Sequence, residues 1–482
     1  MIKIIKKLKK LPLGFKAALV YTIASVFSKG LSIITVPVFT RIMSTDEIGV
    51  VYLYNSWHSI LAAVVTLSLT SGGYIVALKD FENDRDRYQS SVLSLTTLLA
   101  LIVSVVYFIC PRFWNELLGL PTELMILMLA GFLLAPAYDF WLARQRYEYH
   151  YKLAGSLTIL MALIASAAAI FVVLKINNDG GSGVAQGRLF ASNIISYILY
   201  GILWVYIIFK GRLCFSKKYW TYSLKLSIPL VGYALASQVL SVSDRMMISK
   251  MVDNSAVGIY STLYTVSSIS LIVWSAINAS FVPYLYQNID KPENNIKKYS
   301  LQLMGSYAIV AALMTFLAPE IVGFLATEEY FEAIYIMPPI AAGVFLTCVS
   351  NMYTNILIYY KKTHYIMYAS IVAAVANVIL NYFFISQFGY MAAAYTTLAA
   401  YIILAFGQGI CAKLVCKKER KDAPDVYNDK AVGIMALLVI LVTLSGLIWY
   451  QYTIIRYSII VLGTIFGIIY GLKVYKARKS SK

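Results

Sequence analysis

Long apolar runs alternate with short polar segments along the whole chain. A helix needs about 20 apolar residues to cross the hydrocarbon core of a bilayer, and fourteen of the runs come close to this length. Because lipid offers no partner for free backbone groups, runs this long and this apolar predict transmembrane helices. The predicted spans are 17–42, 47–78, 89–110, 121–143, 153–174, 185–209, 220–249, 255–286, 299–318, 332–359, 364–386, 389–412, 431–449 and 454–472.

The composition supports an integral membrane protein. The mean hydropathy is +0.71, and 60% of the 482 residues are hydrophobic. Charged residues make up 13% of the chain, whereas an average soluble domain has about 25%. Most of the chain therefore cannot form a solvated surface, and a soluble enzyme is excluded.

The positive charges follow the predicted spans. The chain has 41 Lys and Arg against 23 Asp and Glu, a net charge of +18, which on a soluble protein would suggest nucleic-acid binding. Alternate polar segments, beginning with the N-terminal one, hold 33 of the 41 cations. Positive residues accumulate in cytoplasmic loops, so this bias predicts a multi-pass protein with both termini in the cytoplasm. Orientation in the membrane explains the charge, and nucleic acid is not an expected partner.

An internal repeat indicates the architecture. Residues 39–50 align with residues 248–259 at an offset of 209, which matches Arg41 to Lys250. Further along, His150 and Tyr151 align with His364 and Tyr365 at an offset of 214. We expect an N-terminal six-helix lobe (1–210), a C-terminal six-helix lobe in the same orientation (211–416), and two accessory helices with a basic tail (417–482). Parallel repeats of this kind are typical of secondary transporters.

Several segments resemble a known family. The segments are Ser243-Asp-Arg-Met-Met-Ile-Ser249 with Val257-Gly-Ile-Tyr-Ser261, and Asn377-Val-Ile-Leu-Asn381 leading through Gly389 to Ala392–Tyr401. They resemble polysaccharide-export flippases of the Wzx type, within the multidrug/oligosaccharidyl-lipid/polysaccharide (MOP) superfamily. The resemblance implies an all-α, MATE/flippase-like fold of fourteen transmembrane helices, with two lobes and two accessory helices.

The same resemblance implies a function. A protein of this type moves undecaprenyl-diphosphate-linked oligosaccharide repeat units, for O-antigen or capsule, across the bacterial inner membrane by alternating access. The implied partners are this lipid-linked glycan, the lipid bilayer and the polysaccharide polymerase machinery. No bond is broken in such a step, so the chain is not expected to be an enzyme.

Cations inside the membrane are the candidate substrate-binding residues. A diphosphate head group needs positive partners in a hydrated cavity. Lys29, Arg188 and Arg245 lie within predicted spans, where an uncompensated cation costs about 2.5–3.5 kcal/mol. Arg41 and Lys250 lie at the far ends of spans one and seven and are candidates for receiving the head group. The alternative for these two is that they extend to the membrane interface without binding substrate.

Two acidic residues inside spans are candidates for ion coupling. Asp244 precedes Arg245, and adjacent side chains on a helix point about 100° apart, so each is expected to pair with other helices rather than with its neighbour. The pair has either a structural role in the C-terminal lobe or a role in substrate binding or coupling. Asp139 is a candidate proton-coupling carboxylate, or a counter-charge for Lys29 or Arg188.

Amide and hydroxyl side chains form a further coupling candidate. Asn377 and Asn381 stand four residues apart, on one helix face, and Thr396 and Thr397 follow on the next span. Their oxygens suit Na⁺, and the resemblance implies a sodium site at similar positions in lipid II flippases. None of the four is a carboxylate, so hydrogen bonding between helices is the alternative. Na⁺ and H⁺ are thus the candidate coupling ions, and no resident cofactor or metal is expected.

Other functions fit the sequence less well. The chain has no Gly-rich phosphate loop ending in Lys-Ser or Lys-Thr, which argues against ATP hydrolysis. An integral-membrane polysaccharide polymerase would carry a large outward loop, which is missing here. A drug or cation antiporter of the same fold is the nearest alternative, and it would favour a dominant acidic residue within a span and fewer cavity cations.

Overall fold

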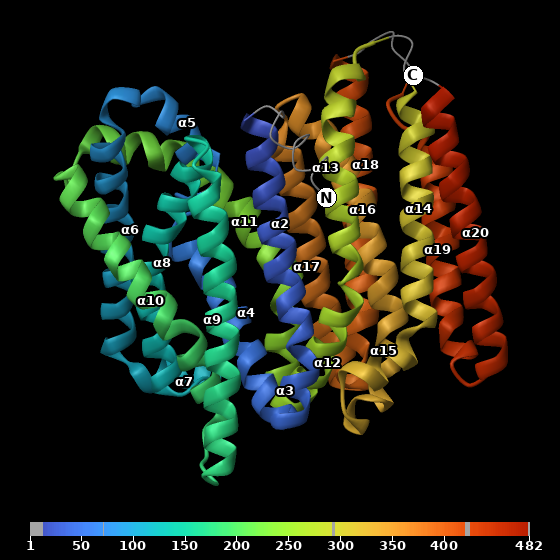
Figure 1. Ribbon diagram of the computed structural model, residues 1–482, viewed down its shortest axis with the longest axis horizontal. Helices are drawn as coiled ribbons and strands as arrows, with labels where there is room; N and C mark the ends of the chain where they lie inside the picture. Colours follow the sequence, from blue (N-terminus) through green and yellow to red (C-terminus); the bar gives the residue numbers. More distant parts are fainter. Residues whose placement is uncertain (1–12, 71, 292–294, 420–424, 481–482) are drawn as a thin grey trace, which may run out of the picture. The chain divides into compact units, whose positions relative to one another are not determined.

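The computed structural model describes residues 13–70, 72–291, 295–419 and 425–480, and within these ranges the chain is helical, with no strand (Figure 1). The predicted all-α class is confirmed. The α-helices are α2 (Leu13–Ile34), α3 (Val36–Ile42), α4 (Thr45–Val65), α5 (Gly72–Asp80), α6 (Arg85–Ile109), α7 (Pro111–Leu118), α8 (Thr122–Tyr147), α9 (Tyr151–Asn178), α10 (Val184–Gly211), α11 (Lys217–Met251), α12 (Asn254–Ser267), α13 (Ser270–Asn288), α14 (Ile296–Phe316), α15 (Ala318–Leu325), α16 (Met337–Tyr359), α17 (Thr363–Phe388), α18 (Ala392–Glu419), α19 (Asp429–Trp449) and α20 (Thr453–Ser480). Short 3₁₀ segments are η1 (Glu82–Asp84), η2 (Glu328–Tyr330) and η3 (Glu332–Ile336).

The described helices include twelve that are long and apolar enough to cross a membrane. The bent helix α11 makes thirteen if its two halves count as one span. The apolar part of α20, Thr453–Ile469, is shorter than the others. The multi-pass character is therefore confirmed, whereas the count of fourteen stays a prediction.

Several predicted spans are not single continuous helices. The first divides between α2 and α3 at Thr35, just before Pro37. The second was expected over 47–78 and is wrong in length, because α4 ends at Val65 and turns follow. In those turns Leu67 and Ser68 adopt left-handed φ values of 47° and 51°. Hydropathy alone does not register such breaks, since the apolar character continues across them.

By its internal packing the chain forms two compact units, Met1–Gln238 (unit 1) and Val239–Lys482 (unit 2). The division falls inside α11 because the first part of this helix packs into the core of unit 1. There the Tyr88 and Ser223 hydroxyls lie 2.7 Å apart, and the Trp220 indole N–H donates to the carbonyl of Ser91. The predicted boundaries at 210 and 416 follow the sequence repeat, and they stay a prediction.

One end of unit 1 carries a network of charges. Asp86, at the start of α6, pairs with Arg144 from the end of α8. Lys210, from the end of α10, lies 3.3 Å from the same carboxylate. The Arg144 guanidinium also donates to Glu148 at 2.9 Å. Three segments that were predicted to be basic cytoplasmic loops therefore meet at one end of the unit.

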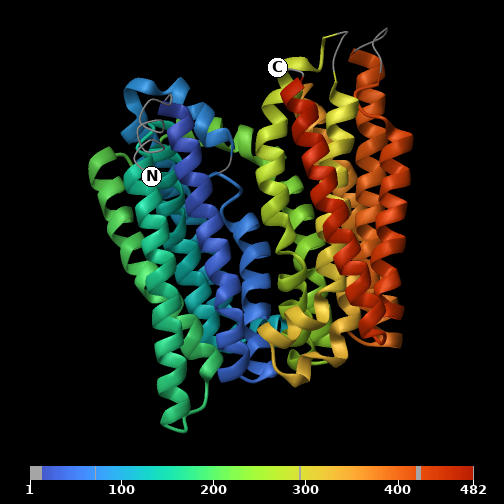
Figure 2. The same cartoon turned by 45° about the vertical axis from the view of Figure 1, so that its right-hand side comes forward.

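Unit 2 is built around α16, which is buried along most of its length. It packs against α14, α18 and α19, and α20 packs against α14 (Figure 2). The link before α19 is anchored by Tyr427, which is buried and donates to the carbonyl of Met352 at 3.2 Å. Burial raises the pKa of Tyr427 well above its usual range, so this hydroxyl stays protonated. Through these contacts the two helices after residue 428 form part of unit 2.

Candidate functional site

The first transmembrane helix presents polar side chains along one face. Thr22, Ser25, Lys29 and Ser32 are all exposed on α2, and their spacing of three and four residues aligns them on one side of the helix. Lys29 lies near the middle of the span Leu19–Ile42. A charged side chain exposed to lipid tails at this depth would cost at least about 2.5 kcal/mol. This polar face of α2 is therefore expected to contact water or a polar ligand.

Two other helices of unit 1 add exposed polar groups. Asn55 on α4 and Asp139 on α8 are both exposed. Asp139 interacts electrostatically with Arg146, two turns further along the same helix. Its expected roles, as a counter-charge for Lys29 or Arg188 and as a coupling carboxylate, stay predictions.

At the end of unit 1 opposite Asp86, Arg188 of α10 contacts α3, the short helix that carries Arg41. The Arg188 guanidinium stacks on Phe39 of α3, 3.6 Å from the ring centroid, and its Nη1 lies 3.6 Å from the sulfur of Met43. Arg41 is exposed on α3, and its Nη1 donates to the carbonyl of Pro37 at 2.6 Å. The Arg188 side chain therefore packs α10 against α3, whereas Arg41 lies at the surface.

Lys250 occupies the matching place in unit 2. It is exposed at the end of α11, 209 residues after Arg41. The next helix starts at the same offset in both units. Ser44 caps α4 by accepting from the Glu47 amide, and Asp253 caps α12 by accepting from the Ala256 amide at 2.7 Å. The repeat found in the sequence is thus accompanied by a similar turn, although the full repeat layout stays a prediction.

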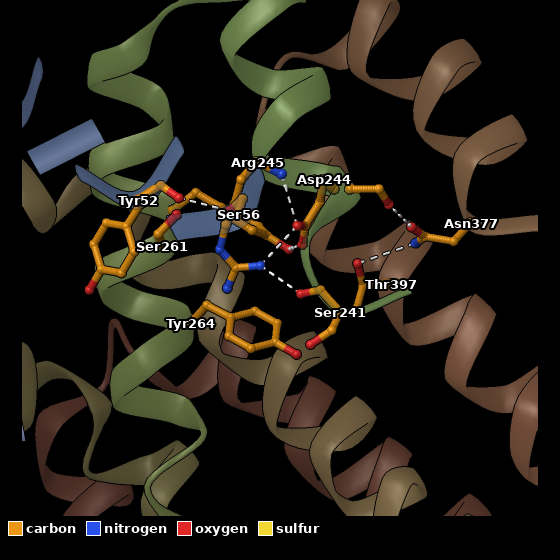
Figure 3. Close-up of polar contacts among 12 residues, drawn as sticks. Tyr52, Ser56, Ser241, Asp244, Arg245, Ser261, Tyr264, Asn377 and Thr397 are labelled. Atoms are coloured by element: carbon orange, nitrogen blue, oxygen red, sulfur yellow. Dashed lines mark hydrogen bonds and ion pairs between the residues drawn. The ribbon is translucent and has the colours of Figure 1, made fainter. Parts of the chain in front are cut away.

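Asp244 and Arg245 are both buried in unit 2, and they bind each other (Figure 3). The Arg245 Nη1 lies 3.0 Å from the Asp244 Oδ1 and also donates to the Ser241 carbonyl at 2.7 Å. The expectation that the two would avoid pairing with each other is wrong. The long arginine side chain folds back along its own helix, which overcomes the 100° between neighbouring positions.

Tyrosines complete this buried group. The Tyr260 hydroxyl donates to Asp244 Oδ2 at 2.6 Å, and the guanidinium of Arg245 lies 4.7 Å from the centroid of the Tyr264 ring. The hydroxyls of Tyr264 and Tyr401 lie 3.2 Å apart. No role was predicted for these tyrosines, although Tyr260 and Tyr401 lie within the family-like segments Val257–Ser261 and Ala392–Tyr401. Aromatic residues are so common in the chain that no pattern distinguished these three.

The amide and hydroxyl side chains predicted to bind Na⁺ are brought together, and all are buried. Figure 3 shows two of them, Asn377 and Thr397. Asn377 Oδ1 accepts from Ser243 at 3.1 Å and from Asn381 at 3.2 Å. The Thr396 hydroxyl donates to Asn381 Oδ1, and the Asn377 amide donates to Thr397 at 3.5 Å. Each amide oxygen thus faces a hydrogen-bond donor.

The hydrogen bonds of this cluster favour contacts between helices over a sodium site, which stays a prediction. None of its side chains carries a negative charge, and its oxygens are directed at N–H and O–H groups rather than at a common centre. The arrangement instead matches hydrogen bonding between α11, α17 and α18.

Another ion pair with a buried arginine lies elsewhere in unit 2 and was not predicted. Arg456 of α20 is buried and pairs with Glu320 of α15. The Nε and Nη1 of Arg456 and the Oε2 of Glu320 are buried without a hydrogen-bond partner. The sequence did offer a clue to this pair, because Arg456 is one of the eight Lys and Arg residues that lie outside the basic polar segments.

One groove of unit 2 lies apart from these residues. It has a volume of about 520 Å³, and small side chains including Ala405, Gly409, Gly433 and Ala436 form part of its apolar lining. None of the candidate substrate or coupling residues lines it.

A family model for polysaccharide biosynthesis proteins matches residues 15–289, more than half of the chain. The chain belongs to this family. The match includes α2 with its polar face, both arginines at the end of unit 1, and the Asp244–Arg245 pair. No curated protein sequence matches the chain.

Solved structures of MOP-superfamily transporters share the fold. The lipid II flippase MurJ in an inward closed conformation is 17% identical, with a TM-score of 0.68, and the match covers 95% of this chain and 99% of MurJ. An inward-facing multidrug-resistance transporter of the MATE family is 14% identical, with a TM-score of 0.60, and the match covers 83% and 96% of the two chains. A MOP-superfamily transporter from Pyrococcus furiosus, described as having a binding pocket of reversed polarity, gives 14% identity and a TM-score of 0.51 over 85% and 97%. The chain thus combines membership of a polysaccharide biosynthesis family with a MurJ/MATE-like fold.

Proposed function

We propose that this protein translocates undecaprenyl-diphosphate-linked oligosaccharide repeat units, of the O-antigen or capsule type, across the bacterial inner membrane by alternating access. The family places the chain in polysaccharide biosynthesis, and the fold is that of transporters which include a lipid II flippase. The observation that carries the proposal is the exposed Lys29 on the polar face of α2, in the middle of a span. A cation at that depth is suited to balancing a diphosphate during its passage.

The other four candidate cations are proposed to have different roles. Arg41 and Lys250 are exposed at helix ends and are proposed to receive the anionic head group. Arg188 is stacked on Phe39, and Arg245 is buried against Asp244. We propose that Arg188 orients the end of α3 near Arg41, and that Arg245 acts within unit 2.

The proposed orientation puts both termini in the cytoplasm of the producing bacterium. In support, Arg144 and Lys210, from the ends of two helices of unit 1, both pair with Asp86. In unit 2, Lys362 pairs with Glu419 at 3.2 Å, and Lys413 lies 3.7 Å from Asp429. Positive residues gather on the cytoplasmic side of membrane proteins. The polymerase machinery is the proposed partner that receives the translocated units on the opposite side.

Replacing Lys29 tests the proposal directly. The gene would be deleted and complemented with Lys29→Gln, Lys29→Arg or, as a matched control, Lys175→Gln, which removes an exposed lysine from the end of α9. A charge-assisted hydrogen bond contributes about 1.5–3 kcal/mol, so Lys29→Gln is expected to lower export about 10- to 100-fold, with lipid-linked oligosaccharide accumulating on the cytoplasmic leaflet. Lys29→Arg and Lys175→Gln should export normally. Full export by Lys29→Gln at a normal protein level would refute the role of Lys29.

A second candidate function is a MATE-like drug or cation antiporter. The exposed carboxylate of Asp139 within α8 favours it, since an antiporter needs an acidic group that alternately binds cation and substrate. The two functions predict opposite results. If the protein is an antiporter, cells that carry Asp139→Asn should become sensitive to cationic drugs. The deletion strain should then show an unchanged level of lipid-linked oligosaccharide.

A further inference from the structure

Unit 2 contains a buried carboxylate whose charge is balanced within the chain. Asp244 and Arg245 have relative exposures of 2% and 7%. Both lie in α11, which has the length and composition of a bent transmembrane span. A carboxylate buried at such a position either binds a proton or has a cation beside it, because an unpaired charge in a low-dielectric region is very costly. Such a cation is either a mobile ion or a side chain.

Both oxygens of Asp244 are already in use. Oδ1 accepts from the backbone N–H of Arg245 at 2.8 Å and from its Nη1 at 3.0 Å. Oδ2 accepts from the Tyr260 hydroxyl at 2.6 Å. The guanidinium itself is held by the Ser241 carbonyl and covered by the ring of Tyr264 (Figure 3). The pair is neutral as a whole and has little access to solvent.

The neighbouring polar cluster offers no alternative cation site. It begins one residue earlier at Ser243 and is closed by hydrogen bonds among uncharged side chains. The carboxylate next to this cluster on α11 is Asp244, and Arg245 already balances its charge. A guanidinium keeps its proton at every physiological pH, and its covalent attachment prevents it from dissociating.

We propose that Arg245 is a tethered counter-cation, which fills the place that a mobile monovalent cation would take beside Asp244, so that unit 2 works without bound Na⁺. Of the coupling candidates, Asp139 in unit 1 lies outside this pair. The inference concerns the charges of unit 2 alone and does not depend on the cargo.

Sodium binding to the purified full-length protein tests this inference. The measurements are ²²Na⁺ binding and thermal unfolding in detergent, in NaCl against choline chloride at equal ionic strength. The wild type is expected to show no saturable Na⁺ binding and the same Tm in both salts. In Arg245→Ala the carboxylate loses its counter-charge, so this variant is expected to bind Na⁺ saturably. At Na⁺ about a hundredfold above its Kd, binding should raise the Tm of the variant by about 5–10 °C.

Two further variants define the cause. The double variant Asp244→Asn/Arg245→Ala has no carboxylate to neutralise and should not respond to Na⁺. Arg112→Ala removes an exposed arginine in unit 1 and should behave as the wild type. Recovery of folded Arg245→Ala only when NaCl is present throughout purification would also support the inference.

Three results would overturn it. The first is saturable Na⁺ binding by the wild type that Asp244→Asn abolishes. The second is a folded Arg245→Ala protein that is indifferent to Na⁺. The third is an Arg245→Ala protein that stays unfolded in both salts while the double variant folds in both, since a mobile cation then cannot replace the guanidinium.

Discussion

Gly211 is the residue at which a single added methyl group should have the clearest effect on unit 1. It is the last residue of α10 and is buried against the first turns of α6. A Cβ built at this position would overlap the Cβ of Ser90 and the backbone oxygen of Asp86. Neither atom belongs to a flexible side-chain end, so Gly211→Ala can be accommodated only by moving the end of α10.

A matched glycine on the same helix isolates this packing cost. Gly201 also lies in α10, and a Cβ there would meet nothing within 4 Å. Both replacements gain the helix propensity of alanine, about 1 kcal/mol, so the difference between the variants reports the packing cost. Overpacking of this kind costs about 1–3 kcal/mol. We therefore expect Gly211→Ala to unfold about 2–12 °C below Gly201→Ala.

Thermal unfolding of the purified variants in one detergent measures this difference. Gly201→Ala should unfold at or slightly above the wild-type temperature. Replacing Ser90 with glycine in the Gly211→Ala background should recover only part of the loss, because the backbone oxygen of Asp86 remains in the way. A Gly211→Ala protein as stable as Gly201→Ala would show that the close approach of α10 to α6 is not maintained.

Three further outcomes are expected. Arg456→Met should lower the free energy of unfolding by about 3–5 kcal/mol, because it leaves the Glu320 charge unpaired. The double variant Arg456→Met/Glu320→Gln should recover part of that loss. Equal stability of the single and double variants would contradict the ion-pair argument. In a double-mutant cycle of thermal stabilities, Arg188→Met and Phe39→Leu should show a coupling of about 1 kcal/mol, from the stacking of guanidinium on ring, and additive effects would exclude it. A C-terminal fusion to green fluorescent protein should fluoresce and one to alkaline phosphatase should be inactive, while the opposite pattern would place the C-terminus outside the cytoplasm.

Local chemistry explains why some of the site could be predicted. Lys29 was recognisable because a lysine within a long apolar run is costly wherever that run spans a membrane. Asn377 and Asn381 were placed together because a spacing of four residues puts side chains on one helix face. Their role was not predictable, since the choice between an ion site and mutual hydrogen bonding depends on Ser243, which is 134 residues away.

The sequence alone determined the class of the protein. Its apolar runs have to form helices that satisfy their own hydrogen bonds, its cations lie mostly in alternate polar segments, and several of its segments resemble those of polysaccharide-export flippases. These properties depend on residue type and spacing along one stretch of chain. Only the tertiary structure decided that Arg245 pairs with its own neighbour, that Arg188 stacks on Phe39, and that the start of α11 belongs to the core of unit 1. Each of these depends on which side chains from distant helices fill the space around a charge or an aromatic ring, and distance along the chain carries little information about that.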